Sequence, residues 1–191
     1  MARIIAGRAK GRRLTTAKGH DTRPTASRVR QTLFDILAPE VPGCRFLDAF
    51  AGSGGVGLEA LSRGAARVVL VEASAPAAEA IRENAAALRA AGGDVSIFRQ
   101  DAQVALAGLA GQGLRFDVIY LDPPYESDLY EPVLELVAAR GLLDEGGVVV
   151  AEHFHKRSLP ETIGGLFRAR SVRVGDHRLS FYRWSGTGRT G

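Results

Sequence analysis

Hydrophobic residues in the middle of the chain form five short, nearly continuous runs that alternate with segments of helical periodicity. The runs cover residues 44–50, 67–73, 95–101, 116–122 and 146–154. The helical segments between them cover residues 57–64, 75–91, 102–110 and 130–141. Short strands that are apolar on both faces and alternate with helices are typical of a parallel sheet covered by helices on both sides. The pattern therefore predicts a doubly wound, mostly parallel, Rossmann-like α/β domain.

The N-terminal part of the chain departs from this alternation. Residues 2–7 and 11–16 predict a short hairpin that presents arginines on one face. Residues 25–37 predict a helix with one apolar stripe, and Arg28 and Arg30 lie outside that stripe. The stripe consists of Val29, Leu33, Ile36 and Leu37. We therefore expect a basic hairpin and a helix in front of the α/β domain.

The C-terminal part predicts a second hairpin. Residues 167–176 and 178–184 alternate in the way expected of two antiparallel strands, with the aromatic residues packing the hairpin. We expect residues 1–38 to form the basic extension and residues 39–184 to form the α/β domain. The glycine-rich and polar residues 185–191 predict a disordered tail.

Length and composition suit one compact domain with a small appendage. The chain has 191 residues, of which 46% are hydrophobic, so it can bury a sizeable core without a disulfide or metal to stabilise it. Cys44 is the single cysteine, which excludes an internal disulfide and predicts a buried structural thiol. Neither a membrane span nor a secretory signal is visible in the sequence. We therefore expect a cytoplasmic protein.

Positive charge is concentrated near the N-terminus. Residues 1–30 carry nine basic side chains against the single acidic residue Asp21, which gives +8 in a chain whose total is +4. Such a segment favours a polyanionic partner, because phosphates attract arginine and lysine and release counterions. A solvated, solubilising tail is the alternative. The basic residues are Arg3, Arg8, Lys10, Arg12, Arg13, Lys18, Arg23, Arg28 and Arg30.

A glycine-rich loop follows the first predicted strand. Gly52, Gly54 and Gly57 have the G-x-G-x-x-G spacing between a strand and a helix, where glycine lets a ligand approach the backbone closely. Glu72 ends the second strand about 20 residues later, in the position that accepts hydrogen bonds from ribose hydroxyls. Asp101 ends the third strand at the same edge. A turn that only permits tight packing is the alternative, but the acid downstream favours a nucleoside-containing ligand.

Charges around this loop favour one type of nucleoside. A dinucleotide places its pyrophosphate at the helix N-terminus. Here Asp48 precedes the loop, and we expect Glu59 in the first turn of the helix. Carboxylates there repel a pyrophosphate but suit a cationic ammonium group. The pattern therefore favours S-adenosylmethionine, which has a ribose, an adenine and an ammonium group, over NAD.

The fourth predicted strand ends in "DPPY", residues Asp122, Pro123, Pro124 and Tyr125. Proline fixes its own φ and disfavours helical backbone in the preceding residue, so Asp122 is held extended at the edge that also carries the glycine loop. Asp122 and a main-chain carbonyl, most plausibly that of Pro123, can each accept one proton of an exocyclic amino group. Tyr125 can stack on the ring. A rigid turn with a packing tyrosine is the alternative.

These motifs resemble a known family. "DPPY" after "GSG" is the signature of methyltransferases that act on amino groups and use S-adenosylmethionine. The order and spacing of further segments are similar to those of the RsmD family, whose members methylate the N2 amino group of one guanine in small-subunit ribosomal RNA. These segments are "RIIAG" with "KGRRL", "TRPTASRVRQTLFDIL", "DAFAGSGGVGLEALSRGA", "VEASAPAAEAIRENAAAL" and "FDVIYLDPPY".

The resemblance implies roles for three groups of residues and a substrate. The catalytic group is Asp122, Pro123, Pro124 and Tyr125. The group that binds S-adenosylmethionine is Asp48, Gly52, Ser53, Gly54, Gly57, Glu72 and Asp101. The RNA-facing group is Arg3, Arg8, Lys10, Arg12, Arg13, Arg23, Arg28 and Arg30. The implied partner is 16S ribosomal RNA in a partly assembled or complete 30S particle, with the enzyme expected as a monomer away from membranes.

Three other functions compete with this one. "DPPY" alone also allows adenine-N6 methylation of DNA or RNA. An NAD-dependent oxidoreductase shares the glycine loop and Glu72, but it leaves Asp48 and "DPPY" unexplained. A non-catalytic RNA-binding module explains only the basic N-terminus. His153 and His155 could ligate a metal, but no third ligand cluster is visible, so we expect ordinary strand-end histidines and no metal.

Overall fold

The computed structural model describes residues 2–16, 24–124 and 127–186. The first elements along the chain are β1 (Ala2–Arg3), β2 (Arg13–Leu14), α1 (Pro24–Ile36), β3 (Arg45–Asp48), α2 (Gly55–Ser62), β4 (Arg67–Val71), α3 (Ala75–Ala90) and β5 (Asp94–Phe98). The later elements are α4 (Ala102–Gly111), β6 (Phe116–Leu121), α5 (Tyr130–Ala139), β7 (Leu143–Phe154), β8 (Thr162–Ile163), β9 (Leu166–Val174) and β10 (His177–Trp184). Each predicted helix and strand is present within a few residues, and the short strand β8 is an element that the sequence pattern missed.

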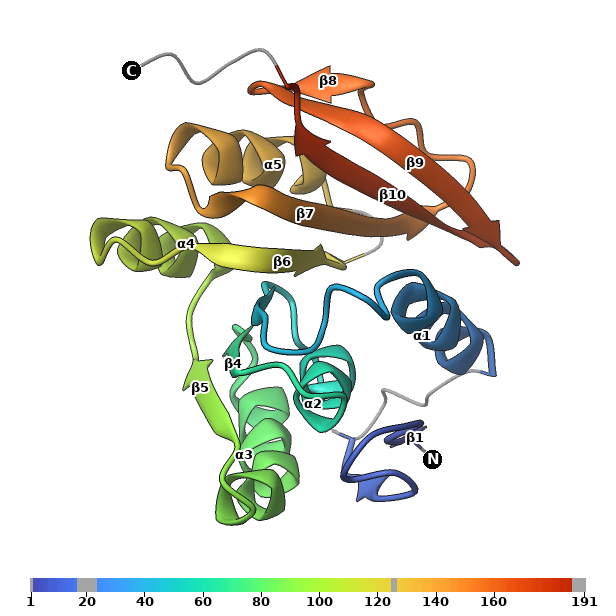
Figure 1. The fold of residues 1–191 in the computed structure, drawn as a ribbon, viewed down its shortest axis with the longest axis vertical. Helices are drawn as coiled ribbons and strands as arrows, with labels where there is room; N and C mark the ends of the chain where they lie inside the picture. Colours follow the sequence, from blue (N-terminus) through green and yellow to red (C-terminus); the bar gives the residue numbers. More distant parts are fainter. Residues whose placement is uncertain (1, 17–23, 125–126, 187–191) are drawn as a thin grey trace.

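Eight strands form one sheet in the order β5-β4-β3-β6-β7-β10-β9-β8 (Figure 1). Strands β3 to β7 are parallel, and β10 runs antiparallel to both β7 and β9. The doubly wound, mostly parallel fold with a closing antiparallel hairpin is therefore confirmed. Chain order reverses between β3 and β6, and the crevice outside the carboxyl ends of the strands at such a point is where ligands bind in sheets of this kind.

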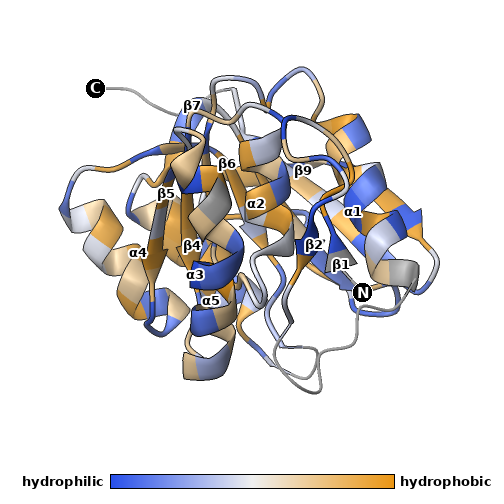
Figure 2. Ribbon diagram, turned by 90° about the horizontal axis from the view of Figure 1, so that it is seen from below, coloured by the Kyte–Doolittle hydropathy of each residue, from blue (hydrophilic) through white to orange (hydrophobic). Residues whose placement is uncertain are grey.

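Each central strand is buried on both faces. Phe46 and Val118 contribute to one hydrophobic core, and their neighbours Leu47 and Ile119 contribute to the other. Helices α1, α2 and α3 pack on the first face of the sheet, and α4 and α5 pack on the second. Figure 2 shows the hydrophobic strands between these helices. Apolar residues of the N-terminal hairpin and α1 belong to the first core, so the basic extension packs against the α/β domain.

The N-terminal hairpin is shorter than predicted, because β1 and β2 pair over only two residues each. Arg3 and Arg13 are paired across it and both are exposed, as the expected arginine face requires. The carboxylate of Glu59 anchors the hairpin to α2: its Oε2 accepts the N–H of Ile5 at 2.6 Å and its Oε1 accepts the N–H of Ala6 at 2.9 Å.

Glu59 corrects one prediction made from the sequence. We expected it in the first turn of its helix, where its charge would oppose a pyrophosphate. It is instead in the second turn of α2, fully buried, and it also accepts a hydrogen bond from Arg63 at 2.7 Å. Its role is to satisfy the backbone of the hairpin. The charge argument against a pyrophosphate therefore rests on Asp48 and the other carboxylates of the cleft.

Replacing Glu59 with alanine should lower the free energy of unfolding by about 3 kcal/mol, since it leaves two backbone N–H groups and the Arg63 guanidinium without their acceptor. The matched control is Glu79→Ala in α3, whose carboxylate pairs with Arg82 and is 63% exposed. Removing that exposed pair should cost less than about 0.5 kcal/mol. Urea denaturation of both variants tests this, and equal losses would show that Glu59 does not hold the hairpin.

Smaller predictions are also settled by the structure. Cys44 is buried, and burial raises the pKa of its thiol to about 12, in keeping with a structural cysteine. Tyr182 is fully buried and Trp184 packs against the same core, as expected for the closing hairpin. His153 is buried, and its Nε2 lies 2.9 Å from the hydroxyl of Ser180.

Among the described residues, none of the helices has both the length and the apolar character needed to cross a membrane.

Candidate active site

An open cleft of about 260 Å³ lies at the carboxyl ends of the central strands. It brings together residues that the sequence placed at this edge, and it adds two polar side chains that the sequence analysis did not select. The predicted residues in its wall are Asp48, Gly52, Ser53 and Asp122. The added ones are Tyr120 and Glu152. The acid-terminated strand and the glycine loop therefore meet in one cleft.

Two glycines of the loop adopt backbone conformations that favour glycine. Gly52 has φ 54° and Gly54 has φ 79°, both in the left-handed region. Gly57 is required for a different reason: a Cβ added there would lie 2.1 Å from the Cδ2 of Leu70. Gly57 therefore lets α2 pack closely on β4, and Gly52 brings its main chain to the wall of the cleft.

Glu72 and Asp101 lie at the predicted strand ends, but both carboxylates make local hydrogen bonds. The Oε2 of Glu72 accepts the N–H of Gly52 at 2.8 Å, and its Oε1 accepts the N–H of Ser74 at 2.7 Å. The Oδ1 of Asp101 caps α4 by accepting the N–H groups of Gln103 and Val104. Glu72 thus fixes the glycine loop. Contacts of these two carboxylates with ribose and adenine stay predictions.

Asp48 is a buried carboxylate with unused hydrogen-bonding capacity. Its side chain is 1% exposed, its Oδ2 accepts the N–H of Gly57 at 3.1 Å, and its Oδ1 is buried with no hydrogen-bond partner in the described part of the chain. Burial raises the pKa of Asp48 to about 7, and the nearby carboxylates of Glu72 and Glu152 contribute. A buried acceptor without a donor indicates a ligand that supplies one, and a cationic donor fits this site best.

Asp122 lines the cleft, and its carboxylate accepts no hydrogen bond from the residues that the structure describes. Limited hydration within the cleft raises its pKa well above the usual range, and the carboxylates of Glu152 and Asp48 raise it further.

The carbonyl groups of Pro123 and Pro124 differ in their hydrogen bonding. The carbonyl of Pro124 accepts the N–H of Ser127 at 2.8 Å. Within the described segments no donor reaches the carbonyl of Pro123, and Pro123 itself is buried. Tyr125, the predicted stacking residue, lies outside the described residues, and so does Arg23.

Tyr120 and Glu152 form a buried polar network that sequence reasoning missed. The hydroxyl of Tyr120 donates to the Oε2 of Glu152, and the Nδ1 of His177 lies 2.8 Å from the Oε1 of the same carboxylate. Tyr130 donates from its hydroxyl to the Glu152 carbonyl at 2.9 Å. The available signal was a polar side chain near the end of an apolar strand, in "VIYLD" and "VVVAE".

Arg30 corrects a second prediction. We expected it outside the buried stripe of its helix, but it is only 8% exposed and lies in the wall of the cleft. Its guanidinium donates to the carbonyl of Arg3 at 2.6 Å, and its Nε is 4.0 Å from Glu59. The other basic residues of the RNA-facing group that the structure describes are on the surface. These exposed residues are Arg3, Arg8, Lys10, Arg12, Arg13 and Arg28.

Asn84 links the hairpin to the glycine loop. Its Oδ1 accepts the N–H of Thr15 at 2.7 Å, and its Nδ2 donates to the carbonyls of Thr15 at 2.8 Å and Ser53 at 3.0 Å. It is buried on α3 one turn after Ile81, on the stripe that covers the sheet. A polar residue on an apolar stripe was the signal for this contact.

Comparison with known proteins agrees with these features. The sequence model of the family described as "Conserved hypothetical protein 95" matches residues 2–183. YlbH of Bacillus subtilis is 37% identical over 184 residues, which cover 96% of this chain and 100% of that protein. Ribosomal RNA small subunit methyltransferase D of Escherichia coli K12 is 36% identical over 158 residues, which cover 83% of this chain and 77% of that protein.

A solved structure extends the likeness to the fold. A hypothetical protein of Thermus thermophilus superposes with a TM-score of 0.81 at 34% identity, over 96% of this chain and 99% of that one. The family model, which begins at residue 2, includes the N-terminal hairpin as well as the sheet. Family model, sequence relatives and structure agree over most of the chain, and the chain belongs to the RsmD family.

Proposed function

We propose that this protein transfers a methyl group from S-adenosylmethionine to the exocyclic N2 amino group of a guanine in small-subunit ribosomal RNA. The observation that carries the proposal is the meeting of Asp122 and the buried Asp48 in the wall of one cleft. The family relative in Escherichia coli is named for methylation of small-subunit ribosomal RNA.

The cleft suits S-adenosylmethionine. The Oδ1 of Asp48 lacks a donor among the described residues, and Gly52 offers main chain without a side chain. The described wall of the cleft has three carboxyl groups, those of Asp48, Asp122 and Glu152, against the guanidinium of Arg30. This excess of acidic groups favours a cationic ligand and opposes a pyrophosphate. This charge pattern speaks against an NAD-dependent oxidoreductase. When bound, the cofactor supplies a methyl group on a positively charged sulfur, so its leaving group needs no further activation.

The acceptors beside the cleft suit an aromatic amine. Such an amine is a weak nucleophile because its lone pair is delocalised into the ring. The Asp122 carboxylate and the Pro123 carbonyl can each accept a hydrogen bond from one N–H of the amino group. These two bonds would orient the lone pair of the amino nitrogen. As the new N–C bond forms, the nitrogen becomes positively charged, and a fixed carboxylate stabilises that charge. Asp122 is also placed to accept the proton that the methylated nitrogen then loses.

Glu152 favours guanine over adenine. Guanine carries an N1–H donor next to its N2 amino group, whereas adenine carries a bare N1 acceptor next to its N6 amino group. Glu152 and Tyr120 place further oxygens in the wall of the cleft that contains Asp122. A second acceptor matches the two adjacent donors of guanine and opposes the lone pair of adenine N1. The 30S particle as substrate, the monomeric state and the cytoplasmic location stay predictions.

The proposal is tested by incubating the protein with S-adenosylmethionine labelled on its methyl group and with small ribosomal subunits that lack the modification. Digestion of the RNA to nucleosides should give labelled N2-methylguanosine. Labelled N6-methyladenosine would favour the alternative function, and label in neither would contradict methylation of this RNA. Naked ribosomal RNA in a parallel reaction shows whether the particle is needed.

A further inference from the structure

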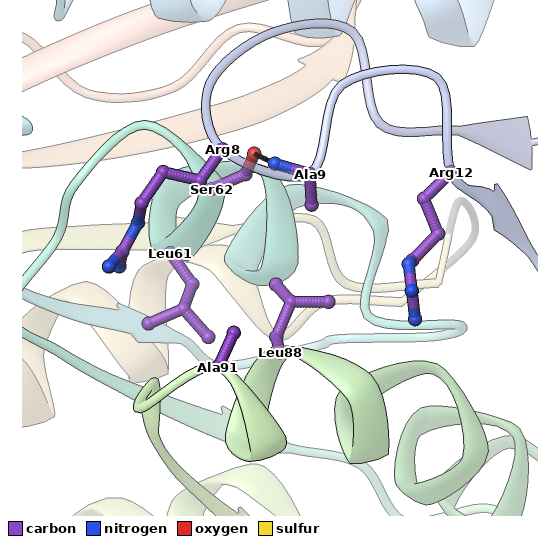
Figure 3. A pocket seen from close by; sticks show the side chains of 7 residues that line it. All are labelled: Arg8, Ala9, Arg12, Leu61, Ser62, Leu88 and Ala91. Atoms are coloured by element: carbon purple, nitrogen blue, oxygen red, sulfur yellow. Dashed lines mark hydrogen bonds between the residues drawn. The ribbon is translucent and has the colours of Figure 1, made fainter.

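A second pocket lies between the N-terminal hairpin and the C-terminal ends of α2 and α3. Leu61, Leu88 and Ala91 give it an apolar floor, and Arg8 and Arg12 flank that floor on opposite sides (Figure 3). Its volume of about 130 Å³ is half that of the catalytic cleft, which is about 260 Å³. The pocket therefore suits a group no larger than a single flat ring.

The wall of this pocket is fixed to the body of the protein. The N–H of Arg8 donates to the carbonyl of Ser62 at 2.8 Å, and the N–H of Ala9 donates to the Ser62 hydroxyl at 2.9 Å. Gly7 allows this close approach, since a Cβ on it would lie 2.0 Å from the Ser62 carbonyl oxygen. The two arginines thus extend from a backbone that is anchored to the end of α2.

The pocket is flanked by two exposed positive charges. Arg8 and Arg12 are exposed, and neither forms an ion pair with any residue that the structure describes. By contrast, Arg63 on the same side of the molecule pairs with Glu59 at 2.7 Å. Two unpaired guanidinium groups beside an apolar floor match a ligand that carries both a phosphate and a flat base.

We propose that this pocket binds one unpaired nucleotide of the RNA substrate, with its base on the apolar floor and its phosphates at Arg8 and Arg12. The inference rests on the proposed action on RNA and adds to it a second contact away from the catalytic cleft. Helix α2 connects the two sites, because Gly55 lies in the wall of the cleft and Ser62 in the wall of the pocket. The rise of the helix places them about 10 Å apart, a span that a few nucleotides of single strand can cover.

A matched pair of variants at Ala91 tests the proposal. This residue is exposed at the C-terminal end of α3, so it tolerates a longer side chain. Ala91→Glu places a carboxylate beside the phosphate site, and it should raise the KM for RNA about tenfold with kcat unchanged. Ala91→Lys places a side chain of similar length on the same part of the floor but with the opposite charge, so its KM should rise clearly less than that of Ala91→Glu. Equal KM values for the two variants would overturn the proposal.

A binding measurement separates this proposal from the proposed methylation. Fluorescence anisotropy with a short oligouridylate and an abasic oligomer of the same length needs no catalysis. The wild-type protein should prefer the oligomer that carries bases, and the double variant Arg8→Gln, Arg12→Gln should bind both weakly with a smaller salt dependence. Arg140→Gln, an exposed change at the end of α5, is the control and should behave as wild type.

The outcomes of these experiments are distinct. If the wild-type protein methylates no RNA but prefers the base-carrying oligomer, the proposed function fails and the pocket stands. If the wild-type protein methylates RNA and binds both oligomers equally, the pocket proposal fails alone. If Ala91→Glu impairs methylation of assembled subunits but not of naked RNA, the pocket holds a ribosomal protein, and the proposal is overturned.

Discussion

Replacing Asp122 with alanine should abolish measurable methyl transfer, with a loss of at least about a thousandfold in kcat. In the proposed reaction the change removes the acceptor that orients the amine and stabilises its developing charge. Asp122 is the carboxylate in the described wall of the cleft that directly follows β6. Single-turnover assays with a labelled methyl donor measure the loss. Binding of S-adenosylhomocysteine and of RNA should stay within about threefold of wild type. The Asp122 side chain lines the cleft and accepts no hydrogen bond from the described residues, so its removal should leave the fold unchanged.

The pH dependence of the wild-type enzyme gives an independent check on Asp122. Its folded-state pKa is raised by limited hydration and by the carboxylates of Glu152 and Asp48. Only the ionised form accepts the proton of the amine, so kcat/KM should rise with pH and level off on the alkaline side. Glu152→Gln removes one of the neighbouring charges and should move the rising limb to lower pH. A limb that does not move would show that Asp122 is not the titrating group.

Replacing Asp48 with asparagine should weaken binding of S-adenosylmethionine about a hundredfold at pH 8, because the cationic cofactor loses a buried counter-charge. The pKa of Asp48 in the protein without ligand is raised to about 7, mainly by burial. The wild-type affinity should therefore rise with pH up to about 7 and then level off. The affinity of the variant should be flat over that range. Isothermal titration calorimetry between pH 5 and pH 9 measures both curves, and parallel curves would contradict a role for Asp48.

The same shift predicts the effect of Asp48 on stability. Its folded-state pKa of about 7 is above the ordinary value of 3.8, so the folded state holds its proton more tightly than the unfolded state. The wild-type protein without ligand should then lose stability as the pH rises from about 4 to about 7. Asp48→Asn lacks this loss, and relative to wild type it should gain about 1–3 kcal/mol over that interval. Thermal unfolding at several pH values measures the difference.

Residues at strand ends could be predicted from the sequence, and residues that join distant segments could not. Asp48 and Asp122 follow apolar strands of a parallel sheet, and topology alone places them at one edge. Glu59 and Arg30 depend on how the N-terminal hairpin packs against α2, a contact between segments more than 50 residues apart along the chain. Periodicity reports which face of a helix is buried, but it does not identify the element that covers it.

Position was also easier to predict than hydrogen bonding. Glu72 and Asp101 lie where the alternation of strands and helices requires, yet the sequence did not indicate that one fixes the glycine loop and the other caps α4. Tyr120 and Glu152 lie on neighbouring strands, and their contact depends on the register between β6 and β7. Register is set by packing across the whole sheet, so a pattern within one strand cannot supply it.

The side chain of Asn84 connects the N-terminal hairpin to the glycine loop. The amide of Asn84 is hydrogen-bonded to both Thr15 and Ser53. We therefore expect a displacement of the segment that follows the hairpin to shift the glycine loop beside the cleft. Thermodynamic linkage is reciprocal. If bound RNA raises the affinity for the methyl donor by some factor, the bound methyl donor raises the affinity for RNA by the same factor.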